Sequence, residues 1–241
     1  MASTILTAAL PLGTFLDSET FVCTIPEYQR GYQWEPQKHT RKLLADLLHA
    51  FSSGQDVALL GNAILRDHGK DGTTSGPWWE GQVRFCDVVD GQQRLTTLVM
   101  LYATIHERMQ TEAPTLKSQI KQLSNRFGGG NGCSPFLTTQ LHHFTSWFNF
   151  TAGLSQRLAK AKNSAGRQER ENAKFIVAWL QQAAEESQRP VDRFLEQFLA
   201  YIDAHVVFTL TITRKTELVF QTFANINYSG KPSKTAHQFA I

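Results

Sequence analysis

A polar stretch with one glycine lies where an apolar run gives way to a helical pattern. Residues 83–89 have the character of a strand, and residues 90–98 follow as Asp-Gly-Gln-Gln-Arg-Leu-Thr-Thr-Leu. A strand that meets a glycine and then enters a helix leaves free backbone N–H groups at the helix N-terminus, where they can hold an anion. The pattern therefore predicts a phosphate-binding turn.

The side chains of this turn supply a carboxylate, two amides and a guanidinium. Arg94 can clamp a phosphate with two parallel hydrogen bonds. Asp90 can hold Mg²⁺ or orient a water, because hard cations prefer carboxylate and phosphate oxygens. Gln92 and Gln93 can bind base, sugar or phosphate edges. The alternative is an ordinary turn in which Asp90 is the N-cap and Arg94 is ion-paired. Because no GxxxxGK[ST] P-loop is present, both interpretations stay open.

An earlier segment, residues 25–34, reads Ile-Pro-Glu-Tyr-Gln-Arg-Gly-Tyr-Gln-Trp. Tyr28, Tyr32 and Trp34 can stack on a nucleobase or cage a modified group. Arg30 can add a second phosphate contact. The alternative is that Tyr32 and Trp34 fasten the helix that follows to the sheet. We expect at least one aromatic ring of this segment in the core with either function.

A third segment, residues 223–230, ends in Asn-Tyr-Ser-Gly. Taken alone, Asn227 and Gly230 belong to a turn that caps a short helix. Other catalytic centres are not indicated, because the sequence has no HExxH pattern, no GxSxG elbow and no His/Asn cluster with zinc-type cysteines. We therefore predict no nuclease centre in this chain.

Composition bounds the class of protein. With 241 residues and 41% hydrophobic content, the chain can bury a sizeable core. The net charge of +3 excludes a strong overall basic field of the kind that argues for nucleic acid, but not a local basic face. Cys23, Cys86 and Cys133 fit neither a disulfide framework nor a zinc site, which predicts a reducing, cytoplasmic location. Neither a signal peptide nor a membrane span of ~20 apolar residues is predicted.

Hydrophobic periodicity predicts a mixed α/β (α+β) fold. Helical spacing is clearest over residues 37–53 and 92–110, and β-type patterns are clearest over 57–66, 83–89 and 205–213. The other predicted elements are an extended lead-in at 15–25, a connection at 67–81, helices at 116–127, 136–150, 175–183, 191–202 and 217–226, and a solvated helix face or link at 151–172.

The order of these elements predicts two regions. We expect a small mixed β-sheet core formed by residues 1–110 and 204–241, interrupted by a largely helical insertion, residues 111–203. The chain ends inside an apolar-looking segment. We therefore expect it to be one domain of a longer polypeptide.

The three polar segments, in this order, resemble the hallmarks of the DUF262 family, the N-terminal domain of GmrSD-type type IV (modification-dependent) restriction endonucleases. That family includes phosphorothioate-sensing proteins of the SspE type. The hallmarks are I-P-x-Y-Q-R-x-Y-x-W at residues 25–34, D-G-Q-Q-R-L-T-T-L at 90–98 and F-x-x-x-N-x-x-G at 223–230. The late element departs from the family at Ser233, where Leu is usual.

The resemblance implies a ParB/sulfiredoxin-like fold that binds and hydrolyses a nucleoside triphosphate, GTP or ATP, with Mg²⁺. The catalytic residues that it implies are Asp90, Gln93 and Arg94, and Asp90 is also the implied metal ligand. The implied nucleotide contacts are Gly91, Gln92, Thr96, Gln29, Arg30, Asn227 and Gly230. The residues implied in contact with DNA or its modification are Tyr28, Arg30, Tyr32 and Trp34.

The resemblance also implies a role in phage defence. The implied partners are modified double-stranded DNA and an HNH-type nuclease, either in a C-terminal domain beyond residue 241 or in a separate subunit; self-association is left open. A phosphorothioate is attractive as the modification, because its large, soft sulfur favours aromatic surface beside cationic groups. Our first hypothesis is an NTP-hydrolysing regulatory and DNA-modification-sensing domain. The alternative is a non-hydrolytic module that reads DNA or docks a partner and uses the motif only structurally.

Overall fold

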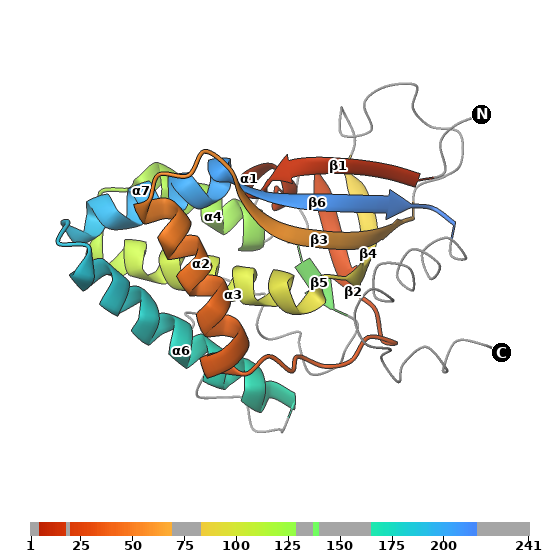
Figure 1. Ribbon diagram of the computed structural model, residues 1–241, viewed down its shortest axis with the longest axis horizontal. Helices are drawn as coiled ribbons and strands as arrows, with labels where there is room; N and C mark the ends of the chain where they lie inside the picture. Colours follow the sequence, from red (N-terminus) through yellow and green to blue (C-terminus); the bar gives the residue numbers. More distant parts are fainter. Residues whose placement is uncertain (1–4, 18–19, 69–82, 129–136, 140–164, 216–241) are drawn as a thin grey trace.

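The computed structural model describes residues 5–17, 20–68, 83–128, 137–139 and 165–215. Over these residues the chain has the mixed α/β fold expected from the sequence. Most of the helical mass gathers to one side of a single mixed β-sheet (Figure 1). None of the helices in the described ranges is long and apolar enough to cross a membrane.

The sheet has the strand order β1-β6-β3-β4-β2-β5. Its strands are β1 (Ile5–Pro11), β2 (Phe21–Ile25), β3 (Ala58–Asp67), β4 (Arg84–Asp90), β5 (Leu137–Thr139) and β6 (Val206–Thr213). β3 is parallel to β6 and antiparallel to β4, while β2 is parallel to both β4 and β5. β1 closes one edge, antiparallel to β6. The candidate turn of residues 90–98 thus begins at the end of β4, next to the centre of the sheet.

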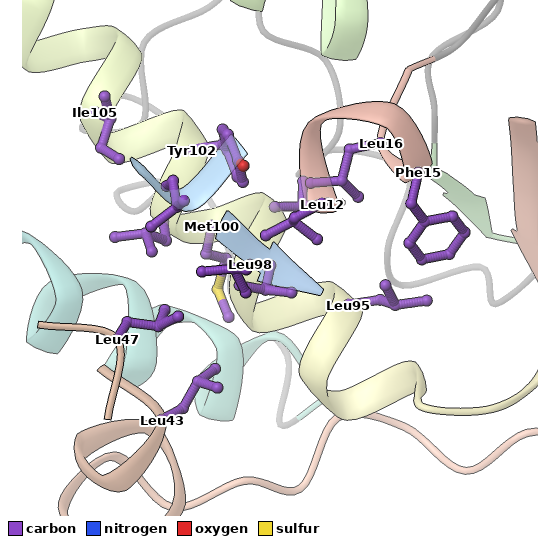
Figure 2. Close-up of a cluster of buried hydrophobic side chains, with 14 of the residues drawn as sticks. Leu12, Phe15, Leu16, Leu43, Leu47, Leu95, Leu98, Met100, Tyr102 and Ile105 are labelled. Atoms are coloured by element: carbon purple, nitrogen blue, oxygen red, sulfur yellow. The ribbon is translucent and has the colours of Figure 1, made fainter. Parts of the chain in front are cut away.

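The helices surround a buried central helix. The central helix is α3 (Gln92–Glu112). The others are α1 (Leu12–Phe15), the π-helical η1 (Pro36–Thr40) continuing into α2 (Arg41–Ser52), α4 (Lys117–Gly128), α6 (Ala165–Glu186) and α7 (Val191–His205). Figure 2 shows side chains of α1 (Leu12, Leu16) and α2 (Leu43, Leu47) gathered around those of α3 (Leu95, Leu98, Met100, Tyr102, Ile105). Because α3 is buried on several sides, the packing around it holds its first turn in a defined place.

The clearest predicted elements are confirmed. Helices at 37–53 and 92–110 correspond to η1 with α2 and to α3, and the strands predicted at 57–66, 83–89 and 205–213 correspond to β3, β4 and β6. The helices have an apolar helical stripe, β6 has a run of β-branched residues, and β3 and β4 have short apolar runs, so local pattern and tertiary packing agree.

Two predictions at weaker patterns need correction, and one strand was missed. The extended lead-in at 15–25 is a strand only from Phe21, because Phe15 ends the short helix α1. β1 was not predicted at all; its small residues become a strand by pairing with β6. Residues 137–139 are a strand and not part of a helix, because they pair with β2. The rest of the predicted helix at 136–150, most of the link at 151–172, and the helix at 217–226 lie outside the described residues.

The division into a core and a helical insertion stays a prediction. Within the described residues, α6 and α7 share one hydrophobic core with α2, α3 and the sheet. The ParB/sulfiredoxin type likewise stays an expectation from the resemblance.

Candidate functional site

The turn between β4 and α3 has a backbone that only glycine accommodates well. Gly91 has a φ of +93°, and a Cβ atom added to it would lie 3.1 Å from Cβ of Ala63 on the neighbouring strand β3. L-residues with side chains rarely adopt this conformation, and the close strand leaves little room for one. The turn is therefore pressed against β3.

The N-terminus of α3 has no side-chain cap. Gly91 occupies the N-cap position without a side-chain hydrogen bond, and the first turn contains no acidic residue. The Leu95 N–H bonds to Gly91 O at 3.0 Å, whereas the N–H groups of residues 92–94 have no acceptor among the described residues. Unsatisfied N–H groups and the positive end of the helix dipole both favour an anion at this point. The alternative in which Asp90 caps the helix is wrong.

Asp90 is partly exposed and lies directly before this N-terminus. Its carboxylate forms no hydrogen bond or ion pair within the described residues. The pairing of β3 with β4 shifts here, because Asp90 faces Ile64 while Val88 faces Leu65, which leaves Val89 as an extra residue. Such β-bulges redirect the side chains beside them and are common next to active sites.

Gln29 holds this bulge in place. Its Nε2 donates to Val89 O at 2.8 Å and, more weakly, to Val88 O at 3.4 Å. The carbonyl of Val89, a residue without a partner on β3, thereby has a donor, so Gln29 stabilises the backbone that carries Asp90.

Arg94 extends from the first turn of α3 over strand β3. Its Nη1 donates to Asn62 O at 2.9 Å, and no acidic residue of the described ranges forms a salt bridge with it. The ion pair expected for Arg94 in an ordinary turn is therefore not found within the described residues. A guanidinium with one donor on a neutral carbonyl keeps most of its five N–H donors for a ligand. Arg94, Asp90 and the N–H groups of residues 92–94, which have no acceptor among the described residues, thus all lie at the start of α3.

The two glutamines of the motif bind the backbone of the earlier segment. Gln92 Nε2 donates to Arg30 O at 2.7 Å. Gln93 Oε1 accepts from the Gln33 N–H at 2.7 Å, and its Nε2 donates to Gly31 O at 3.3 Å. Both side chains are buried. Two motifs about 60 positions apart in the sequence thus lie side by side, joined through amide groups.

The aromatic residues of this segment differ in exposure. Tyr32 is in the core, 4% exposed, which confirms that at least one ring of the segment is structural. Burial raises the pKa of the Tyr32 phenol to about 12. Trp34 is partly buried and stacks on His39, with ring centroids 5.8 Å apart. Tyr28 is 45% exposed, and Arg30 is exposed as well. Of the three rings, that of Tyr28 is therefore the most open to a large ligand.

Helix α6 supports the segment from the other side. The Trp34 carbonyl accepts hydrogen bonds of 2.7 Å from both Gln168 and Asn172. Asn172 also accepts a hydrogen bond from the Thr40 hydroxyl. Nearby, Glu169 is 2% exposed, and burial raises its pKa to about 7. The sequence contained no signal for these contacts, because α6 reads as an ordinary polar and apolar helix.

The remaining predicted residues divide between the core and the undescribed part. Thr96 is buried, and its Oγ1 has no hydrogen-bond partner within the described residues. Asn227 and Gly230 lie outside the described residues. Gly61 and Asn62, which contact Arg94, were missed; a glycine inside the predicted strand 57–66 was the available signal, since such glycines often mark a bulge or a close contact.

Comparison with known protein families matches residues 12–239 to the GmrSD restriction endonuclease, N-terminal domain. The chain belongs to this family. The match spans all three polar segments and confirms the resemblance seen in them. No curated protein matches the chain. The GmrSD N-terminal domain is a restriction-system domain of phage defence, in a system that acts on DNA and includes a nuclease.

Proposed function

We propose that this GmrSD-type domain binds and hydrolyses a nucleoside triphosphate and couples hydrolysis to the sensing of modified DNA. The observation that carries the proposal is the uncapped N-terminus of α3, with Arg94 and Asp90 beside it. Within the described residues, the N–H groups of residues 92–94 and the Asp90 carboxylate have no partner, and Arg94 has no acidic one. Together they have the donors, the positive charge and the carboxylate that a triphosphate with Mg²⁺ requires.

The triphosphate would bind with its oxygens on the N–H groups of residues 92–94 and on the guanidinium of Arg94. Mg²⁺ on a nucleotide needs only one or two protein carboxylates, because phosphate oxygens and waters complete its shell. Asp90, whose carboxylate has no partner within the described residues, fits this need. When bound, the ion neutralises charge on the phosphate oxygens during transfer. Asp90 also lies where it can orient a water, and Arg94 stabilises the charge that develops on the phosphates.

Gln93 is proposed here as a positioning residue. Both ends of its amide bind the backbone of residues 31–33, so its side chain is occupied away from a ligand. Gln92 is occupied in the same way by Arg30 O. The two amides would couple the nucleotide to residues 25–34, because a shift of the first turn of α3 pulls directly on that segment.

That segment is the proposed contact with modified DNA. Tyr28 and Arg30 are its exposed aromatic and cationic groups, and this pair suits a soft, poorly hydrated phosphorothioate. Tyr32 and Trp34 would not contact the DNA but would anchor the segment to the hydrophobic core. DNA contact would then change the first turn of α3 through the glutamines, and the signal would pass to the HNH-type nuclease of the system.

A non-hydrolytic module remains the second candidate, and one observation favours it. Gln92 and Gln93 act as braces between two segments, which is a structural use of the motif. Such a module would still read DNA or dock a partner through Tyr28 and Arg30.

Phosphate release separates the two functions. We expect release from GTP or ATP with Mg²⁺ by the wild type in the presence of modified duplex, lowered by at least roughly a hundredfold in Arg94→Ala and Asp90→Ala. Arg167→Ala is the matched control, since Arg167 lies on α6 with its side chain 73% exposed. If the wild type and Arg94→Ala are equally inert with modified DNA present, hydrolysis is rejected and the non-hydrolytic function stands.

A second assay tests the DNA contact. In electrophoretic shifts, Tyr28→Ala and Arg30→Ala should lose discrimination between phosphorothioate and unmodified duplex, while Lys42→Ala, with a side chain 76% exposed on α2, keeps it. Equal binding of both duplexes by the wild type would reject phosphorothioate sensing.

A further inference from the structure

Strand β3 has an irregularity directly below Arg94. Its pairing with β6 runs Leu59 to Val207 and then Gly61 to Phe208, so Leu60 has no partner. Bulges of this kind are rare in parallel pairs. Gly61 also has a φ of +101°, a backbone conformation that side-chain-bearing residues rarely adopt. The bulge therefore depends on glycine.

The guanidinium of Arg94 occupies the space that a side chain at position 61 would need. A Cβ atom built on Gly61 would lie 2.9 Å from Nη1 and 3.3 Å from Cζ of Arg94. From this place Nη1 donates to Asn62 O, the carbonyl of the next residue along the strand. The bulge thus provides both the room for the guanidinium and the acceptor that orients it.

A flexible arginine is useful at an anion site only when its donors face the anion. The bond to Asn62 O fixes one donor of a guanidinium that extends from the first turn of α3, whose N–H groups at residues 92–94 have no acceptor among the described residues. Gly61 has no side chain with which to bind a phosphate, so we expect its influence on a ligand to act through Arg94.

We propose that Gly61 is a positioning residue for Arg94, and that the β3 bulge holds the guanidinium ready for a phosphate group. The inference rests on the proposed function, because it concerns the same anion site. A residue larger than glycine at position 61 would push the guanidinium off the strand, break the bond to Asn62 O, and weaken nucleotide binding while the fold persists.

The test uses Gly61→Ala with Gly54→Ala as its matched control. Gly54 also has a positive φ, +63°, but a Cβ atom there would meet nothing within 4 Å. Both variants bear a cost of backbone strain, whereas only Gly61→Ala displaces Arg94. By calorimetry with GTP or ATP and Mg²⁺, we expect about tenfold weaker binding in Gly61→Ala, the loss of about one charge-assisted hydrogen bond, and wild-type binding in Gly54→Ala.

A double-mutant cycle makes the assignment specific. In the Arg94→Ala background, Gly61→Ala should weaken binding no further, and the double variant should melt at a higher temperature than Gly61→Ala because the crowding is gone. If Gly61→Ala proves unfolded, Gly61→Asn takes its place in the same cycle, since Asn tolerates positive φ better than other residues with side chains.

The outcomes separate the two proposals. Two outcomes overturn the role of Gly61 but leave the proposed anion site standing. One is additive losses of binding in the cycle; the other is wild-type binding by Gly61→Ala when Arg94→Ala has lost binding. Wild-type nucleotide binding by Arg94→Ala overturns the proposed anion site and the positioning role with it. The melting temperatures need no nucleotide, so failure to see recovery in the double variant counts against the contact itself.

Discussion

Tyr32 and Thr97 share a buried hydrogen bond of 2.7 Å, although they lie 65 positions apart in the sequence. The Thr97 hydroxyl donates to Gln93 O at 2.8 Å, so the proton of the shared bond comes from Tyr32. The Tyr32 phenol therefore binds the first turns of α3 through Thr97. The side-chain amide of Gln93, also on α3, binds the backbone of the aromatic segment that contains Tyr32. The two segments form one unit, and a disturbance of either reaches the other.

Replacement of Tyr32 by Phe should lower the free energy of unfolding by about 1 kcal/mol, the net value of one buried hydrogen bond. The ring still fills the core, and the Thr97 hydroxyl keeps its bond to Gln93. Thermal or urea denaturation measures the change, with Tyr28→Phe as control because Tyr28 is 45% exposed. In Tyr32→Phe/Thr97→Val the losses should be less than additive; full additivity would show that the two hydroxyls do not interact.

Gln29→Glu should disturb the bulge of β4 while changing the size of the side chain very little. A carboxylate cannot donate to Val88 O or Val89 O, so the carbonyls lose their donor and face a negative charge. We expect a loss of about 1–3 kcal/mol in the free energy of unfolding and a parallel loss of phosphate release, because the bulge carries Asp90.

Gln33→Ala is the control for that variant. Gln33 lies on the same segment and is exposed, and its contact with Gln93 uses its backbone N–H, which alanine retains. Stability and activity of Gln29→Glu equal to those of Gln33→Ala would mean that the bulge needs no side-chain donor.

Asp90→Asn should separate activity from stability. Because the Asp90 carboxylate neither caps α3 nor pairs within the described residues, its neutralisation should leave the melting temperature nearly unchanged. Phosphate release should fall by roughly a hundredfold or more, since Asn is a poor ligand for Mg²⁺ and a poor base.

Asp87→Asn on the same strand provides the contrast. Asp87 is 4% exposed and paired with Arg66 and His68, at 2.5 and 2.8 Å, so its loss should cost about 3 kcal/mol of stability. A large loss of stability in Asp90→Asn would show that Asp90 has a structural role after all.

Glu169 predicts a pH dependence of stability. Its pKa is raised by burial from an ordinary value of 4.5 to about 7, so the folded protein holds the proton more tightly than the unfolded chain does. The stability associated with the neutral carboxyl is complete below pH 4.5 and is lost as the pH rises toward 7, on the order of 2 kcal/mol in total.

Glu169→Gln should remove this loss, because the amide stays neutral across the range. Denaturation between pH 4.5 and 8, compared with Glu171→Gln on the exposed side of α6, measures the difference. Identical pH profiles for the wild type and Glu169→Gln would show that the buried carboxyl is already ionised at little cost.

The sequence by itself determined the family, the mixed α/β class and the strand, glycine and helix order around Asp90. These features are local: the period of α3, the β-branched run of β6 and the glycine of the turn are each expressed within a few neighbouring residues. The prediction of free N–H groups at the start of α3 also follows from local order alone.

Only the tertiary structure decided what the side chains of the motif do. Gln92 and Gln93 looked like ligand groups in the sequence, but bind backbone about 60 positions away. Gly61 lies against Arg94 only because β3 pairs with β6 through a bulge and the first turn of α3 lies next to that bulge. Such partners are set by the register of non-local strands and by the packing of a helix on a sheet, which a local pattern does not encode.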